Sequence, residues 1–149
     1  HFGFSVSTAG AIMVLYGVGG LAYSQLARRL VGALGERGLC ILGAGSFALA
    51  MLLLAWSEQP WLAVLACPMG GVGFYMLHGT LQTRATQMAP QARATAVSLF
   101  ACLLFFGQSL GVWLMGKGVD RGAFALCLTA MAAGVLVVGM LVASQTESH

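Results

Sequence analysis

The chain has 149 residues, of which 59% are hydrophobic and only 7% are charged, and its formal net charge is +3. Soluble domains carry about 25% charged residues, so the charges here are too few to cover the surface of a soluble protein. Lipid is therefore the expected solvent, and we predict an all-α membrane protein.

Five stretches of the chain contain no charged residue, and each is long enough to cross a bilayer. A spanning helix needs roughly 20 apolar residues to cross a hydrocarbon core of about 30 Å. We predict transmembrane helices at about residues 7–27, 38–56, 61–83, 91–116 and 122–144. Buried helices of a large soluble protein would be about 10–14 residues long, each with a polar face. The first stretch has no basic leader and is one of five similar segments, which argues against a signal peptide.

The polar joints between these stretches alternate in charge. The first and third joints hold five of the seven basic residues, namely Arg28, Arg29, Arg37, Arg84 and Arg93. Basic joints usually face the cytoplasm, which predicts an N-terminus outside and a C-terminus inside. Residues 82–100 are then a cytoplasmic turn between two spans. The arginines are either simple topology anchors or part of a gate, and the sequence leaves both interpretations open.

Polar side chains within the spans gather on the third predicted helix. Tyr75, His78 and Gln82 are spaced by three and four residues and therefore share one helical face. Such side chains usually face the bundle interior or a water-filled cavity; alternatively, they only hydrogen-bond neighbouring helices. We interpret them as candidates for lining a substrate path. Tyr16 of the first helix and Gln108 of the fourth are further candidates.

The remaining helices carry little polar chemistry. Residues 38–56 and 122–144 are nearly featureless, and we expect them at the lipid-facing periphery of the bundle. In the fourth predicted helix Gly107 and Gly111 form a G-x-x-x-G pattern, which is typical of close helix packing in membranes.

Other familiar chemistries are missing from the sequence. The four cysteines lack C-x-x-C spacing, the three histidines have no ligand spacing, and there is no G-x-x-x-x-G-K-[ST] phosphate loop. We therefore expect no metal, no cofactor, no enzymatic activity and no nucleic-acid partner. No Asp or Glu lies deep in a predicted span, so a carboxylate that couples transport to protons or cations is expected to lie in another part of the protein.

Four motifs, in this order, resemble the second half of a major facilitator superfamily transporter. Phe4-Ser-Val-Ser-Thr-Ala-Gly10 is similar to an outer loop and helix start common in the drug-efflux branch. The stretch from Gly20 to Gly38 is similar to the family's basic loop motif, although it lacks the Asp that usually precedes the basic residues. Ala89-Pro-Gln-Ala-Arg93-Ala-Thr-Ala96 resembles the loop entering the eleventh helix, and Gly107-Gln-Ser-Leu-Gly111 a stretch within that helix.

The resemblance implies a fold and a function. Residues 1–149 would be the eighth to twelfth helices, which is most of the C-terminal six-helix half, and the N-terminal half would be a missing partner. The expected function is proton-coupled efflux of small lipophilic compounds from a bacterial cell across the inner membrane. Two alternatives stay open: uptake of a sugar or other metabolite, and a non-transporting membrane scaffold or anchor.

Overall fold

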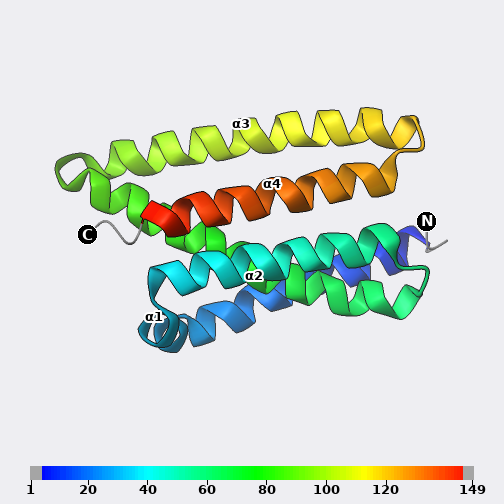
Figure 1. The fold of residues 1–149 in the computed structure, drawn as a ribbon, viewed down its shortest axis with the longest axis horizontal. Coiled ribbons are helices and arrows are strands. Elements are labelled where there is room, and N and C mark those ends of the chain that lie inside the picture. Colours follow the sequence, from blue (N-terminus) through cyan, green and yellow to red (C-terminus); the bar gives the residue numbers. More distant parts are fainter. Residues whose placement is uncertain (1–4, 146–149) are drawn as a thin grey trace.

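The computed structural model describes residues 5–145, and these residues form long helices joined by short turns (Figure 1). The helices are α1 (Val6–Trp56), α2 (Pro60–Met88), α3 (Arg93–Asp120) and α4 (Phe124–Gln145), and a single 3-10 turn, η1 (Pro90–Ala92), precedes α3. Each of the four is long and apolar enough to cross a membrane. The prediction of an all-α chain with helices long and apolar enough to span a membrane is confirmed. Phe4, which opens the first family-like motif, lies outside the described residues, as do His1 and His149.

The structure has four helices where the sequence predicted five, because the first two predicted spans belong to the single long helix α1. Only Gly35 departs from helical geometry within it, with φ 63° and ψ 178°. A positive φ of this kind is accessible to glycine at no steric cost. The chain reverses direction there, so that the parts of α1 before and after Gly35 run side by side (Figure 1). Arg28 and Arg29 are helical rather than part of a loop.

The basic joint between the third and fourth predicted spans, residues 82–100, is also shorter than predicted. Helix α2 continues past the apolar stretch to Met88, and the chain turns only at Ala89 before Pro90 begins η1. Proline is tolerated in the first turn of a helix, where its missing N–H has no intrahelical partner. Most of residues 82–100 is therefore helical, and Arg84 lies inside α2.

Glycines allow α2 to pack against both parts of α1. A Cβ built at Gly73 would lie 2.6 Å from the Phe47 backbone nitrogen and 2.7 Å from the Gly43 carbonyl oxygen. On another face of α2, a Cβ at Gly71 would overlap the Tyr16 carbonyl. Small residues let helices in membranes approach this closely, and the contacts are made by backbone atoms.

The second part of α1 is the centre of the described bundle, so its predicted place at the periphery is wrong. It contributes seven of the buried residues, namely Leu39, Cys40, Gly43, Ala44, Ala48, Ala50 and Ala55. The same small side chains that make the stretch featureless allow α2 and α4 to pack on it from two sides. Gly139 of α4 lies against Ala44, and the Trp56 indole N–H donates to the Thr129 hydroxyl at 3.0 Å.

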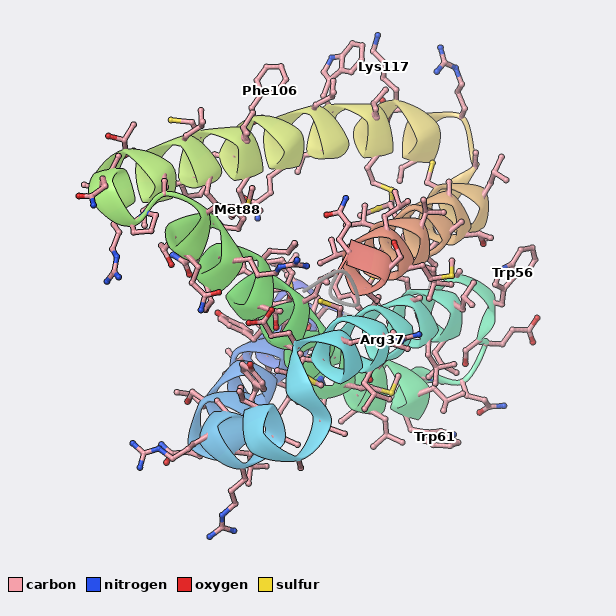
Figure 2. All side chains as sticks on the ribbon, turned by 60° about the vertical axis from the view of Figure 1, so that its left-hand side comes forward. Arg37, Trp56, Trp61, Met88, Phe106 and Lys117 are labelled. Atoms are coloured by element: carbon pink, nitrogen blue, oxygen red, sulfur yellow. The ribbon has the colours of Figure 1, made fainter. Side chains whose placement is uncertain are left out.

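Helix α3 has no buried residue and lies along the outside of the described bundle (Figures 1 and 2). Phe106 is 71% exposed and points away from the other helices, as Lys117 does near the end of α3 (Figure 2). Lipid is an acceptable neighbour for the apolar side chains of α3 such as Phe106, so their exposure costs nothing in a membrane.

Candidate functional site: a groove between α1 and α2

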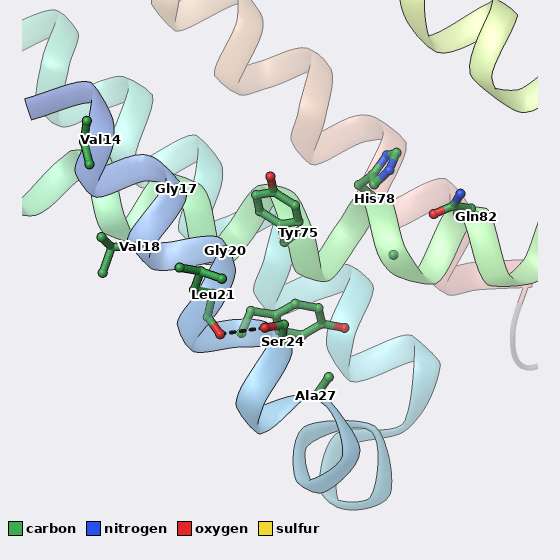
Figure 3. A pocket seen from close by; sticks show the side chains of 12 residues that line it. Val14, Gly17, Val18, Gly20, Leu21, Ser24, Ala27, Tyr75, His78 and Gln82 are labelled. Atoms are coloured by element: carbon green, nitrogen blue, oxygen red, sulfur yellow. Dashed lines mark hydrogen bonds between the residues drawn. The ribbon is translucent and has the colours of Figure 1, made fainter. Parts of the chain in front are cut away.

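The polar face of α2 borders a groove of about 760 Å³ between α2 and the first part of α1 (Figure 3). Tyr75, His78 and Gln82 lie on successive turns of α2 along it. None of the lining residues is charged. They are Val14, Gly17, Val18, Gly20, Leu21, Tyr23, Ser24 and Ala27 of α1, and Tyr75, His78, Gly79 and Gln82 of α2.

Tyr16, the predicted cavity residue of α1, is not among the lining residues of the groove. Its ring packs against α2, with centroids 6.0 Å from Phe74 and 6.5 Å from Tyr75. Tyr75 in turn lies over Gly20, and a Cβ added at Gly20 would therefore collide with the Tyr75 ring. Tyr16 and Gly20 therefore set the position of the Tyr75 ring, which is 40% exposed.

Phe74 is the residue around which the aromatic side chains gather, and we did not single it out from the sequence as part of the site. His78 stacks on it at 5.3 Å with an interplanar angle of 6°, and Phe47 lies 6.2 Å away. The spacing of Phe74 and His78 by four residues was the available signal, because such pairs are neighbours on a helix surface. His78 also reaches α3, where Phe100 is 5.4 Å away.

His78 and Gln82 differ from the hydroxyl residues of the same helix in how their hydrogen bonds are met. Thr80 and Thr83 donate to the carbonyls of Met76 and Gly79, at 2.8 and 2.9 Å. Back-bonding of this kind satisfies a hydroxyl within its own helix. Among residues 5–145, neither the His78 imidazole nor the Gln82 amide has a hydrogen-bond partner in the protein. In a membrane, water, a ligand or a helix outside the described residues would have to supply their partners.

The candidates on α3 are not brought to the groove. Gln108 is exposed, and a Cβ built at Gly107 or Gly111 would meet no atom within 4 Å. The described chain thus contains no helix packed on this glycine pair, and its role in close packing stays a prediction.

Five of the seven basic residues, Arg28, Arg29, Arg37, Arg84 and Arg93, belong to segments at one end of the bundle. The turn at Gly35, the turn between α2 and α3 and the end of α4 are all at this end, and the other two turns are at the opposite end (Figure 1). Arg28, Arg29, Arg37 and Arg93 are exposed.

Arg84 is different, because it joins three segments. Its Nη1 donates to the Val142 carbonyl at 3.1 Å, and its Nε lies 3.8 Å from the Glu36 carboxylate. Val142 is within the last turn of α4, whose carbonyls have no partner inside the helix. Arg84 therefore caps α4 and holds it beside the turn of α1.

No group of three or more His, Cys, Asp or Glu side chains that could hold a metal occurs within residues 5–145. Comparison of the chain with family models, with curated proteins and with solved structures gave no match. The arrangement of the groove is therefore the basis for a functional proposal.

Proposed function

We propose that the chain serves in secondary transport, as part of a major facilitator transporter that expels small lipophilic compounds in exchange for protons. The observation that carries the proposal is the groove, where His78 and Gln82 have no hydrogen-bond partner among residues 5–145. Unpaired polar groups at membrane depth are expensive unless they face water or a ligand. The groove has no charged lining residue, which suits neutral or lipophilic cargo.

The proposal includes an orientation and a partner. The end that carries five arginines would face the cytoplasm, and the end with Glu58, Lys117, Asp120 and Arg121 would face outward. We place the protein in the bacterial inner membrane with the two parts of α1 as separate spans, five in all. Alternating access needs two helical halves around a midplane site, so a second half would face the open side of the groove.

Transport is tested with the full-length protein in everted membrane vesicles. A lipophilic fluorescent cargo should accumulate in the vesicles only while a proton gradient is present, and collapse of the gradient should release it. His78→Ala should lower this flux without lowering protein abundance, because His78 borders the groove. Gly45→Ala, in the second part of α1, outside the groove and with no atom within 4 Å of the new Cβ, is the matched control and should transport normally.

The alternatives give different results in the same assay. An importer would move a polar metabolite, and it would do so in intact cells rather than in everted vesicles. A scaffold or anchor would show no gradient-dependent flux of either kind. If His78→Ala instead reduced folded protein while the remaining molecules transported normally, His78 would be a packing residue and the proposed role of the groove would be wrong.

A further inference from the structure

The polarity of the groove changes along its length. On α1, Val14, Val18 and Leu21 line one end, whereas Ser24 and Ala27 line the other, opposite Gln82 of α2 (Figure 3). The 13 helical steps from Val14 to Ala27 rise about 20 Å at about 1.5 Å each. The groove is thus long, apolar at one end and polar at the other, and only α1 and α2 line it.

The residue that follows the last lining residue of α1 is cationic. Arg28 follows Ala27 directly and is exposed. With 3.6 residues per turn, Arg28 lies about 20° around the helix from Leu21 and about 40° from Ser24, so it continues the face of α1 that lines the groove. Arg29 lies about 80° around the helix from Leu21 and about 140° from Ser24, so at this end of the groove it lies farther from the lining face than Arg28 does. Among residues 5–145, no carboxylate forms an ion pair with Arg28.

We propose that this groove binds a single-chain carboxylate amphiphile of the fatty-acid class, with its chain along Val14, Val18 and Leu21 and its carboxylate at Arg28. The long apolar end matches one acyl chain, and the Gln82 amide matches the polar atoms next to the head, whereas the Ser24 hydroxyl already donates to the Leu21 carbonyl at 2.8 Å. The carboxylate and the guanidinium are complementary in charge and hydrogen-bond geometry. This inference rests on the groove assigned above as the transport path and names its ligand class.

The glycines of α1 offer a way to fill the groove without disturbing the fold. A Cβ built at Gly17, which lines the groove, would meet no atom within 4 Å. Gly17→Leu should therefore fold normally while its side chain occupies the space of the acyl chain. Gly45 in the second part of α1 also has nothing within 4 Å and does not line the groove, so Gly45→Leu is the matched control.

The test measures binding of a palmitate analogue that carries a photoreactive group in mid-chain. The full-length protein is placed in phosphatidylcholine nanodiscs, at a pH where the carboxylate is ionised. We expect photolabelling of residues 14–21, competition by palmitate, and weaker competition by the alcohol and the trimethylammonium amphiphile of the same chain length. Arg28→Gln should weaken palmitate binding about tenfold, the scale of one charge-assisted hydrogen bond at a partly solvated site. Arg29→Gln and Gly45→Leu should bind as the parent does, and Gly17→Leu should lose the labelling.

Several results would overturn the inference. These are equal competition by the carboxylate and the alcohol, equal losses for Arg28→Gln and Arg29→Gln, or labelling outside residues 14–21 that Gly17→Leu does not change. The readout is binding, so the two proposals fail separately. Binding without gradient-driven flux would leave this inference standing and remove the proposed transport function. Flux of other lipophilic cargo without palmitate binding would leave the proposed transport function standing and remove this inference.

Discussion

Replacement of Gly73 by alanine should destabilise the protein, because the new methyl group would press on backbone rather than on a flexible side chain. The added Cβ would lie 2.6 Å from the Phe47 nitrogen and 2.7 Å from the Gly43 carbonyl oxygen. These atoms belong to the helical backbone in the second part of α1, so relief requires α1 and α2 to separate. Overpacking of this kind typically costs about 1–3 kcal/mol.

Helix propensity works in the opposite direction and must be removed from the measurement. Glycine is less favourable than alanine in a helix by roughly 1 kcal/mol. The higher helix propensity of alanine therefore offsets part of the steric destabilisation in Gly73→Ala. Gly45→Ala receives the same propensity gain, and its Cβ would meet nothing within 4 Å. The difference between the two variants isolates the steric cost, and we expect about 1–3 kcal/mol.

The assay is reversible unfolding in mixed detergent micelles, followed by tryptophan fluorescence. Trp56 and Trp61 lie at the turn that joins α1 to α2 and report separation of these helices. Gly73→Ala should unfold at a lower denaturing-detergent fraction than Gly45→Ala. A difference in unfolding free energy below about 0.5 kcal/mol, the usual size for unconstrained surface changes, would refute the close contact between α1 and α2.

Three further predictions follow from single contacts and from the ends of the bundle. Arg84→Gln should lower the unfolding free energy more than Glu36→Gln does. The charged hydrogen bond from Arg84 to the Val142 carbonyl contributes about 1.5–3 kcal/mol, whereas the exposed ion pair between Arg84 and Glu36 contributes only about 0.2–1 kcal/mol. Equal losses in the two variants would contradict the capping role. Trp56→Phe should cost about 0.6 kcal/mol through its lost bond to Thr129, and a Thr129→Val background should abolish that cost, whereas additive losses would show that the bond does not form. In a variant without native cysteines, cysteines at Ser57 and Arg121 should react with an impermeant thiol reagent from outside intact cells, and one at Gln91 should not; the reverse pattern would overturn the orientation.

Most of the helical segments could be predicted from the sequence, because the absence of charge over some twenty residues is a direct requirement of the hydrocarbon core. The ends of the helices were less predictable. Charge marks where a chain leaves the membrane, but Arg28, Arg29 and Arg84 are helix-compatible residues, and the helices continue through them until Gly35 or Pro90 stops them. Local backbone chemistry, rather than polarity, ends these helices.

The candidate site was predictable only where a single helix determines it. Tyr75, His78 and Gln82 share a face by spacing alone, and the structure places all three along the groove. The helix that faces these residues is set by close contacts such as Gly19 against Pro68 and Gly71 against Tyr16. The sequence contains twenty-one glycines, and it does not reveal which of these glycines lie at a helix contact. The same limit explains the central position of residues 38–56, whose small side chains give no polar signal.

The central claim is that the polar face of α2 borders a solvated groove at membrane depth. A spin label at position 82 in the full-length protein, reconstituted in lipid, reports this through its collisions with a water-soluble nickel complex and with oxygen, which prefers the bilayer. Leu126 on α4 is 69% exposed and lies outside the groove, so a label there is the lipid-facing control. The groove predicts strong nickel and weak oxygen accessibility at position 82, and the opposite ratio at position 126. Oxygen-dominated accessibility at both positions would show that this face of α2 meets lipid and would contradict the account.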